Sequence, residues 1–237
     1  MKKILILALP LMVMCFASCE KDKGTEAGGV TEDGIIVFKD QNFLDALLKV
    51  MEIGVFDPSS GDDIVATMDI DKNKDGQISV DEAKETKALN LYDGETEYGN
   101  ITDISEIRYF TSLVDLRCYY NRITSLDVSE NADLLVLACY DNQLTSLNVS
   151  KNTKLISLGC DTNKLTTLDI SHNTELTDLT CFDNQLTSLD VSNNTALEFL
   201  NCSNNPLKIL TISESQRNAS WLDDVKSEYP DIEIIVK

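Results

Sequence analysis

Residues 155–175 read LISLGCDTNKLTTLDISHNTE, and residues 176–196, LTDLTCFDNQLTSLDVSNNTA, repeat the same pattern after an interval of 21 residues. The same interval separates the repeated cysteines Cys118, Cys139, Cys160, Cys181 and Cys202. It also separates the repeated asparagines Asn121, Asn142, Asn163, Asn184 and Asn205. Copies that keep one phase predict a stack of similar coils, because no single coil can bury its apolar face alone.

The repeated unit reads L-x-x-L-x-C-x-x-N-x-L-T-S-L-D-V-S-x-N-x-x. This unit resembles the leucine-rich-repeat signature, with cysteine in the third apolar position. The resemblance implies an α/β repeat solenoid of 21-residue repeats with parallel strands. In each repeat the L-x-C segment forms a short strand whose two apolar side chains point inward, and the strands stack about 4.8 Å apart. We therefore predict a solenoid over residues 89–212 and a C-terminal cap over residues 213–237.

Two columns of asparagine have a predicted role at the bends of each coil. The amides of the first column, which contains Asn163, are placed to bond backbone groups that are exposed where the chain leaves the strand. The second column, which lies beside repeated serines, is predicted to do the same at the opposite corner. Its members are Asn131, Asn152, Asn173 and Asn194.

The cysteine column admits three interpretations: metal ligands, disulfide partners or core residues. Metal sites need converging ligands with a local spacing such as C-x-x-C, which the repeat does not contain. Neighbouring cysteines would lie in register on parallel strands, and five in a row cannot all form pairs. We predict that they act as small core hydrophobes.

Residues 1–18 have the pattern of a lipoprotein signal peptide. Two lysines precede an apolar run over residues 4–16, which is too short to span a bilayer. The run ends in the sequence FASC at residues 16–19, which resembles a bacterial lipobox with phenylalanine in place of the usual branched aliphatic residue. The resemblance implies cleavage before Cys19 and lipidation of that cysteine. The alternative is an ordinary secretory signal that is cut after Ala17 or Ser18.

Residues 19–35 are rich in glycine, threonine and charged residues, and we predict a flexible tether there. This start is similar to that of Bacteroidetes lipoproteins, in which acidic residues after the cysteine accompany display on the outer surface. The resemblance implies a secreted protein that is held to the bacterial outer membrane by its lipid anchor alone.

Residues 71–82, DKNKDGQISVDE, match the calcium loop of an EF-hand. Oxygen-bearing residues stand at loop positions 1, 3, 5 and 12, glycine stands at position 6 and isoleucine at position 8. The predicted calcium ligands are Asp71, Asn73, Asp75, the backbone carbonyl of Gln77, and the carboxylate of Glu82. The alternative is a polar surface turn that precedes a helix.

The segments around this loop predict a small helical cap over residues 36–88. We expect an amphipathic helix over residues 43–51, a loop over residues 58–61, a short second helix over residues 62–68 and an exit helix over residues 82–88. The cap and repeats together resemble a family of Bacteroidetes surface leucine-rich-repeat lipoproteins with an EF-hand-like calcium loop. The chain departs from that family by its long insert between the first helix and the loop.

The composition excludes some classes of partner and activity. The formal net charge of −20 argues against nucleic acid and against electrostatic docking on anionic lipid. A catalytic site needs a nucleophile, a base and charge-stabilising donors in one place, and no such motif is found. The one histidine, His172, stands where sister repeats carry glutamate, lysine or asparagine. We therefore predict that the protein is not an enzyme.

Positions that vary between repeats fall on the outward side of the predicted strands, which line the concave face of the solenoid. Aromatic residues and arginine at these positions are typical of binding sites. The predicted ligand-binding residues are Arg117, Tyr119, Tyr140, Phe182 and Phe199. These residues favour a recognition module for a protein or glycan. The alternative is a passive structural or adhesion-spacer protein, stabilised by calcium, in which the variation has no function.

Overall fold

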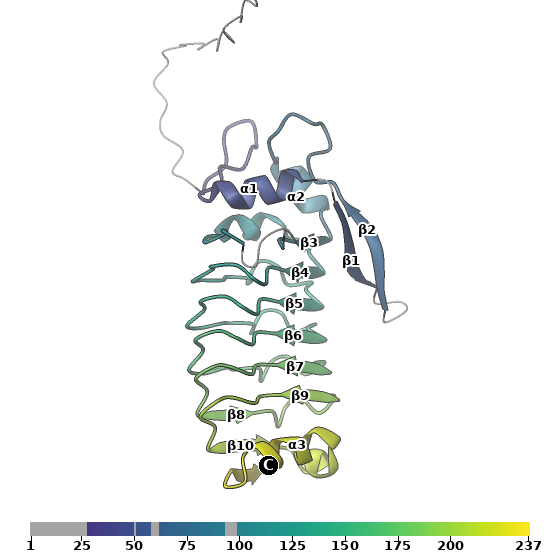
Figure 1. Cartoon of the computed structure of the whole chain (residues 1–237). Helices are drawn as coiled ribbons and strands as arrows, with labels where there is room; N and C mark the ends of the chain where they lie inside the picture. The colour runs from purple at the N-terminus through teal and green to yellow at the C-terminus, as the bar shows by residue number, and fades with distance from the viewer. Residues whose placement is uncertain (1–27, 50, 58–61, 93–98) are drawn as a thin grey trace, which may run out of the picture.

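The computed structural model describes residues 28–49, 51–57, 62–92 and 99–237, with the backbone alone for residues 51–57 and 62–67. Short parallel strands, one from each coil, form a sheet along one side of a solenoid (Figure 1). In order along the sheet they are β3 (Ala88–Asn90), β4 (Asp115–Arg117), β5 (Val136–Ala138), β6 (Ser157–Gly159), β7 (Asp178–Thr180) and β9 (Phe199–Asn201). The central leucines pair in register, as Leu137 does with Leu158. The predicted α/β repeat solenoid is confirmed.

A second line of parallel pairing follows the segment that reads S-L-D, S-L-N or T-L-D in successive coils. No strand was predicted for this segment. Asn148 forms single bridges with Asp127 in the preceding coil and with Asp169 in the next. Toward the C-terminus this line widens into a sheet. Its strands, in order, are β11 (Glu233–Val236), β10 (Ile209–Ile212) and β8 (Ser188–Asp190).

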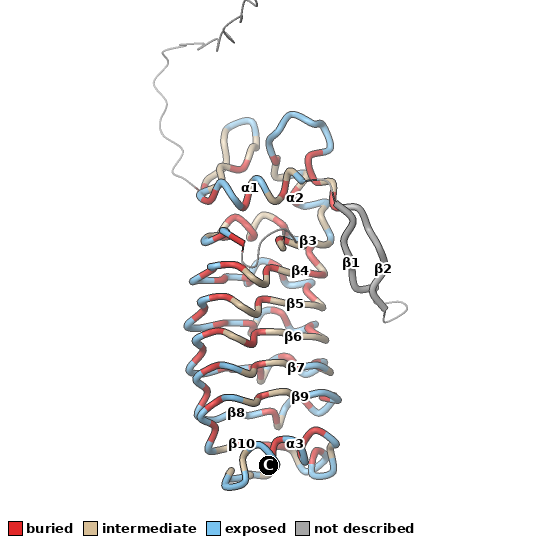
Figure 2. The backbone as a smooth tube through the Cα atoms, in the orientation of Figure 1, coloured by how far each residue is buried: buried red, intermediate tan, exposed pale blue. Residues whose placement is uncertain are grey.

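The repeated apolar side chains form one continuous core, and the buried positions recur at the same place in every coil (Figure 2). Leu137 and Leu158 are almost completely buried. The repeat cysteines are buried free thiols, as predicted for core hydrophobes. Burial raises the pKa of the Cys118 thiol to about 12. Burial also raises the pKa of the Cys139 thiol, and the neighbouring Cys118 thiol contributes to that increase. The thiols therefore stay protonated and packed.

The first asparagine column forms the predicted ladder. Asn163 Nδ2 donates to the carbonyl oxygens of Cys160 at 3.2 Å and of Asp161 at 3.1 Å in its own coil. It also donates to Cys139 O in the preceding coil at 3.1 Å, while its Oδ1 accepts from Leu144 N at 2.9 Å. Each amide thus joins two coils by four hydrogen bonds, and both polar atoms of the buried side chain have partners.

The second column makes fewer bonds. Asn152 Nδ2 donates to Val128 O at 3.0 Å and to Asn131 O at 2.9 Å. Its Oδ1 is buried and accepts no hydrogen bond within the described residues, and the same holds at the other members of the column. At the C-terminal end the side chain of Gln216 continues the column, because its Nε2 donates to the carbonyl oxygens of Val191 and Asn194.

The C-terminal cap closes both the core and the last unpaired carbonyl groups. After a 3-10 helix, η2 (Glu214–Asn218), helix α3 (Ser220–Glu228) buries Trp221 against the last coil. Trp221 Nε1 donates to Leu197 O at 3.1 Å. The Tyr229 hydroxyl donates to Cys202 O at 2.8 Å, in the place that a further ladder asparagine would take. The predicted cap is confirmed.

Helix α1 (Gln41–Leu48) covers the N-terminal end of the core with Phe43 and Leu47. Asp40 caps the helix, since its Oδ1 accepts from the backbone N–H of Asn42, and its Oδ2 accepts from Thr102 N at 2.6 Å. The cap is therefore bonded to the solenoid directly ahead of a 3-10 helix, η1 (Ser105–Tyr109). The helix ends three residues before the predicted limit.

The prediction of a short helix over residues 62–68 was wrong. Strands β1 (Met51–Asp57) and β2 (Asp62–Met68) form an antiparallel hairpin, which stands out to the side of the stack (Figure 1). β-Branched residues such as Ile53, Val55 and Ile64 favour extended backbone, and two adjacent segments of equal length can pair their backbones. The predicted loop over residues 58–61 lies outside the described residues.

Helix α2 (Val80–Glu85) follows the loop at residues 71–79 and ends three residues before the predicted exit helix does. The chain then enters β3, whose Leu89 pairs with Leu116 as the first rung of the sheet. Cys19, the signal segment and the first part of the tether lie outside the described residues. Among the residues that are described, no helix has the length and apolar character needed to cross a membrane.

Candidate functional site

The outward side of strands β4, β5, β6, β7 and β9, together with the first residues after each strand, forms the sheet face, which corresponds to the predicted concave face. Arg117 and Asp115 lie on this face of β4 because alternate residues of a strand point the same way. Arg117 Nε lies 3.0 Å from Asp115 Oδ1, and NH2 lies 2.9 Å from Oδ2. Asp115 is buried and Arg117 is half-buried. The predicted ligand residue Arg117 is therefore held in an ion pair.

Four tyrosines gather next to this pair, and we call them the tyrosine cluster. Tyr119 and Tyr140 occupy equivalent positions after β4 and β5, and their rings stack with centroids 4.5 Å apart and planes 3° apart. Tyr92 lies 5.4 Å from Tyr119, and Tyr120 meets both stacked rings edge-on. All four side chains are partly exposed. The cluster presents a continuous aromatic surface with phenol groups for hydrogen bonding.

A cavity of about 250 Å³ opens beside the cluster, between Tyr140 and Phe182. These two residues stand in the same column two coils apart, which corresponds to roughly 10 Å at the spacing of stacked strands. Between them Gly159 forms part of the lining, where other coils carry larger side chains. A Cβ atom at Gly159 would lie 3.5 Å from Tyr140 Cδ1 and 3.4 Å from Thr180 Oγ1. We call this cavity the Gly159 slot.

The acid of the Gly159 slot is Asp161, which takes the place of an aromatic residue in its column. Its side chain is only 6% exposed, and its Oδ1 accepts from Thr180 Oγ1 at 2.6 Å. Burial raises the pKa of Asp161, with a further contribution from the charge of Asp183. Burial also raises the pKa of Asp141, together with the charges of Asp161 and Asp183. Asp161, which lines the slot, is therefore close enough to Asp141 and Asp183 for their charges to repel one another.

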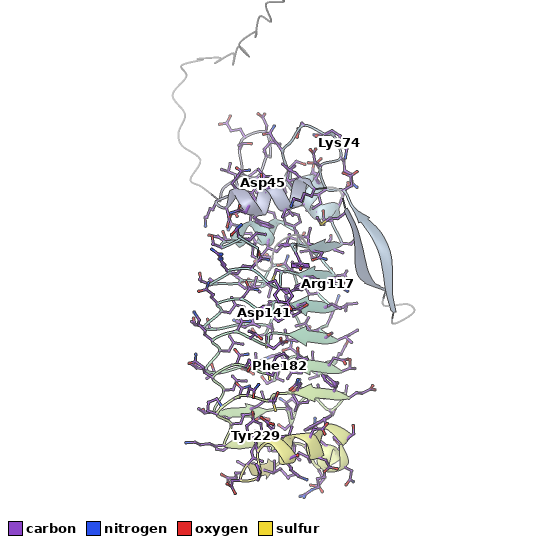
Figure 3. The ribbon with its side chains drawn as sticks, in the orientation of Figure 1. Asp45, Lys74, Arg117, Asp141, Phe182 and Tyr229 are labelled. Atoms are coloured by element: carbon purple, nitrogen blue, oxygen red, sulfur yellow. The ribbon has the colours of Figure 1, made fainter. Side chains whose placement is uncertain are left out.

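Within the part of the chain that the structure describes, no cationic side chain in the slot balances its carboxylates. Asp178 lines the slot beside Asp161, and its Oδ2 accepts from the Thr177 hydroxyl at 2.6 Å. Among the residues that the structure describes, no lysine or arginine contributes to the lining. Figure 3 shows Arg117, Asp141 and Phe182 one below another along the solenoid, with one coil between the levels of Asp141 and Phe182. The sheet face thus changes from an ion-paired arginine to acids along its length.

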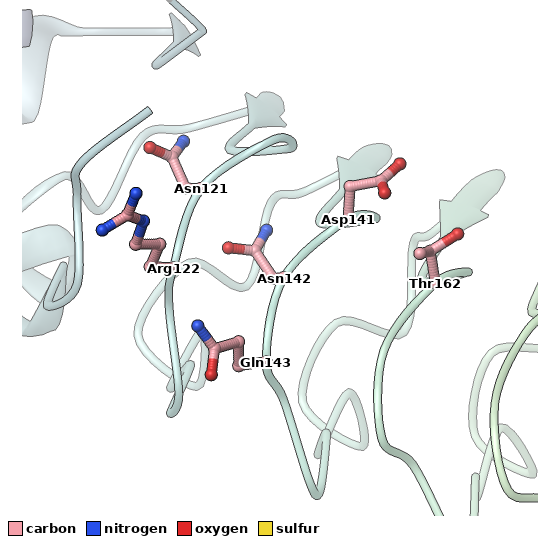
Figure 4. A pocket seen from close by; sticks show the side chains of 6 residues that line it. All are labelled: Asn121, Arg122, Asp141, Asn142, Gln143 and Thr162. Atoms are coloured by element: carbon pink, nitrogen blue, oxygen red, sulfur yellow. The ribbon is translucent and has the colours of Figure 1, made fainter. Parts of the chain in front are cut away.

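A second cavity, of about 300 Å³, lies where the chain turns away from the sheet (Figure 4). Its lining is polar and consists of Asn121, Arg122, Asp141, Asn142, Gln143 and Thr162. Asp141 and Thr162 have left-handed backbone, with φ values of 50° and 49°. The residue before each ladder asparagine shares this conformation, including Tyr120. Each ladder amide holds its own turn: Asn142 Nδ2 donates to Tyr140 O and Asn163 Nδ2 donates to Asp161 O, in each case the carbonyl directly before the left-handed residue.

Phe199, the remaining predicted ligand residue, is 49% exposed on β9. It lies in a different column from Phe182, which directly follows β7. The structure therefore brings Tyr119 and Tyr140 together, places Phe182 across the Gly159 slot, and leaves Phe199 at the C-terminal end of the sheet face.

Ser171 Oγ and His172 Nδ1 lie 3.2 Å apart and share a hydrogen bond whose direction depends on the histidine tautomer. Both residues lie at the surface in a turn in which Ser171 N donates to Asp169 Oδ1. The same turn recurs in other coils where no histidine is present. The contact follows from the repeat.

The loop at residues 71–82 folds closely around its own acidic side chains. Asp71 Oδ1 accepts from Asp75 N at 3.2 Å, and Oδ2 accepts from Gly76 N at 2.9 Å. Gly76 has a φ of 77°, which explains the glycine at this position. Asn73 Oδ1 accepts from Asp75 N at 2.9 Å, so that these side chains share one turn.

Glu82 joins the two ends of this loop. Its Oε1 accepts from Lys72 N at 2.9 Å and its Oε2 from Ser79 N at 2.9 Å, within a capping box at the start of α2. Burial raises the pKa of Glu82, but hydrogen bonds from Ser79 and Lys72 outweigh it and lower the pKa overall. The oxygen-only donor set and the ionised carboxylate fit calcium chemistry. However, no three acidic, thiol or imidazole groups converge as a metal site within the described residues.

The functional domain of InlJ from Listeria monocytogenes, whose solved structure is described as including a cysteine ladder, is 41% identical with a TM-score of 0.51. The match covers 58% of this chain and 32% of the InlJ chain. This chain is a leucine-rich-repeat solenoid. The leucine-rich-repeat solenoid spans about a third of the InlJ chain that it resembles, and the cysteine column is a feature that the two share.

Two further solved structures resemble the leucine-rich-repeat solenoid in fold. A leucine-rich-repeat protein of Leptospira interrogans is 24% identical with a TM-score of 0.48, over 65% of this chain and 44% of its own. The internalin InlF of Listeria monocytogenes is 20% identical with a TM-score of 0.48, over 67% of this chain and 58% of its own. No protein-family model and no curated protein matches the chain.

Several residues of the site were not selected from the sequence. Tyr92 follows Leu91 as Tyr119 follows Cys118, and an alignment of the irregular first coil on these pairs would have found it. Gly159 and Asp161 belong to the variable columns. What distinguishes each of them is its difference from the other residues of its column: Gly159 is smaller than all of them, and Asp161 is an acid between two aromatic residues. That contrast defines a cavity only after the coils are stacked.

Proposed function

We propose that this leucine-rich-repeat solenoid is a recognition module that binds a protein through its sheet face on the bacterial cell surface. The observation that carries the proposal is the tyrosine cluster beside the Gly159 slot on one continuous face. Partly exposed tyrosines next to a cavity combine apolar area with hydrogen-bonding groups, as in protein interfaces. A glycan is the second ligand class that such a surface accepts.

The alternative is a passive spacer, whose exposed residues carry no function. Against this stands Asp161, a buried carboxylate whose pKa is raised by burial and by a neighbouring acid. In its ionised form such a residue lowers the free energy of unfolding, and a passive spacer would gain nothing from this destabilisation. Peptide and glycan arrays probed with the mature chain distinguish the two. We expect binding that is lost in Tyr119→Ser and Tyr140→Ser, whereas silence on all arrays favours the spacer.

The location at the cell surface rests on the sequence of the N-terminus. We propose that lipid on Cys19 anchors the protein to the outer membrane and that residues 19–35 act as the tether. In the native bacterium, wild-type protein should fractionate with membranes and take up an alkyne fatty acid. Cys19→Ala should be soluble and unlabelled, and an unlabelled wild type would contradict the anchor.

We also propose that the loop at residues 71–82 binds calcium and stabilises the N-terminal cap. The support is the oxygen donor set of Asp71, Asn73 and Asp75 in one tight turn around Gly76, and Glu82, which joins the two ends of the loop. Calcium that binds only the folded cap should raise its melting temperature by mass action. The increase should vanish in Asp75→Ala, which leaves the Glu82 capping box intact. Identical melting in chelator and in calcium would show that the loop is only a turn.

A further inference from the structure

We propose that the Gly159 slot binds the cationic side chain of an arginine or lysine that belongs to the protein ligand. This inference rests on the proposed function and names the chemistry of the ligand at that site. Its elements are the aromatic walls of Tyr140 and Phe182, the Gly159 lining, and the carboxylates of Asp161 and Asp178.

The aromatic walls fit a flat cation. Tyr140 stacks one face of its ring on Tyr119, so that its other side borders the slot. Phe182 stands about two coil spacings away, roughly 10 Å, which is more than the roughly 7 Å that separates two rings with a planar group sandwiched between them; the gap therefore admits a flat cation that stacks on one of the two rings. A guanidinium or ammonium group over an aromatic ring gains cation–π attraction, and the gain increases when water is excluded.

The carboxylates supply the charge and the direction. Thr180 Oγ1 donates to Asp161 Oδ1 at 2.6 Å, which fixes the orientation of the acid. Within the described residues no other side chain donates to Asp161, so the carboxylate retains acceptor capacity for the two-pronged hydrogen bonding of a guanidinium. Its low exposure means that a bound cation would be shielded from solvent.

The slot is deep at Gly159 because this residue has no side chain. The negative net charge of the protein favours a positively charged ligand. The neighbouring strands carry Ala138 and Thr180 at this position, so that a larger residue in β6 would fill the space above the sheet. The chain has a net charge of −20, and the slot has no lysine or arginine in its described lining. A basic ligand is therefore attracted at long range and held at close range.

The test is an NMR titration of the isotopically labelled mature chain with the peptide acetyl-Gly-Arg-Gly-amide. Its matched control is the same peptide with citrulline, which has the shape of arginine without the charge. We expect saturable shifts of the backbone amide signals of Gly159, Asp161 and Thr180 with the arginine peptide. The shifts should weaken with added salt, and the citrulline peptide should bind at least about tenfold more weakly.

Variants test the assignment of the site. Asp161→Asn keeps an acceptor for Thr180 but loses the charge, and Gly159→Leu fills the slot; each should weaken arginine-peptide binding at least about tenfold. Asp133→Asn, which removes a surface carboxylate paired with Lys154 at 2.7 Å, should have no effect. Unchanged amide signals in remote coils show that each variant is folded.

Equal binding of the citrulline peptide, or full binding by Asp161→Asn, would overturn the proposal. Shifts of the same amides with N-acetylglucosamine but not with the arginine peptide would also overturn it and would assign the slot to a glycan. The titration needs no natural ligand. A failure here therefore leaves protein recognition by the sheet face intact, whereas failure of the array experiment with tyrosine variants removes the proposed function itself.

Discussion

The rings of Tyr119 and Tyr140 stack in parallel, with their centroids 4.5 Å apart. The two residues are separated by one repeat of 21 residues, and the rise of one coil equals a stacking distance. One face of Tyr140 is therefore covered by Tyr119, while its other side forms a wall of the Gly159 slot. The stack fixes that wall before any ligand arrives.

A double-mutant cycle measures this contact. Tyr119→Leu and Tyr140→Leu each remove the stack but keep apolar bulk, so the coupling free energy should be about 0.5–1.5 kcal/mol in chemical denaturation. A coupling of zero would mean that the rings do not stack in solution. Tyr229→Leu, which lies at the C-terminal cap, should show no coupling to Tyr119.

Core truncation should have a much larger effect on stability. Leu158→Ala removes a buried side chain between two coils and should cost about 2–5 kcal/mol in the free energy of unfolding. The matched surface variant is Lys164→Ala, in the same coil, which should change stability by less than about 0.5 kcal/mol. Denaturant midpoints check both values. Equal effects of the two variants would contradict the packing.

Much of this architecture follows from the sequence, because the period of the repeat determines both the stacking and the inward positions. The register of Leu137 with Leu158 requires only that like residues pair. The hairpin over β1 and β2 could not be derived in that way, since it occurs once and its pairing depends on two segments outside the repeat. The helix assigned to residues 62–68 failed for that reason.

The two asparagine columns should differ in energetic weight. Asn163→Ala removes four hydrogen bonds and leaves Leu144 N buried without a partner, so it should cost about 2–4 kcal/mol. Asn152→Ala removes two bonds to carbonyl oxygens that retain other donors, and should cost about 1–2 kcal/mol. Thermal and chemical denaturation of both variants measure the order, and the reverse order would contradict the ladder assignment.

Thr162 is a position where stability can be gained. Its φ of 49° is unfavourable for a β-branched residue, while asparagine tolerates this conformation. Thr162→Asn should therefore stabilise the protein by about 0.5–1.5 kcal/mol. Asp183 stands at the equivalent turn of the next repeat. Asp183→Asn should have a smaller effect, because aspartate already tolerates left-handed backbone. A destabilised Thr162→Asn would contradict the observed backbone.

Asp161 should make stability depend on pH. Burial, with a contribution from Asp183, raises its pKa in the folded state above the value in the unfolded chain. The folded state then holds more protons between the two pKa values, so the stability contributed by this group falls as pH rises through that window. Asp161→Asn should therefore melt higher than wild type at pH 7, and the difference should shrink toward pH 4. A variant that melts lower at pH 7 would contradict the assignment.

The site was only partly predictable, for a related reason. The variable columns placed Tyr119, Tyr140 and Phe182 on one face, because the outward positions of a strand follow from its alternation. The ion pair of Arg117 with Asp115 and the cavity at Gly159 depend on side-chain conformations and on what neighbouring coils omit. Neither the ion pair nor the cavity can be derived from the sequence of a single repeat.

Recognition by the sheet face is tested most directly by an array of basic, neutral and acidic peptides probed with wild type, Tyr140→Ala, Phe182→Ala and Asp133→Asn. Wild type and Asp133→Asn should bind the same arginine- or lysine-containing peptides, whereas the two aromatic variants should remain folded and bind them at least about tenfold more weakly. Aromatic variants that bind as well as wild type, or a wild type that binds none of the peptides, would contradict recognition by the sheet face.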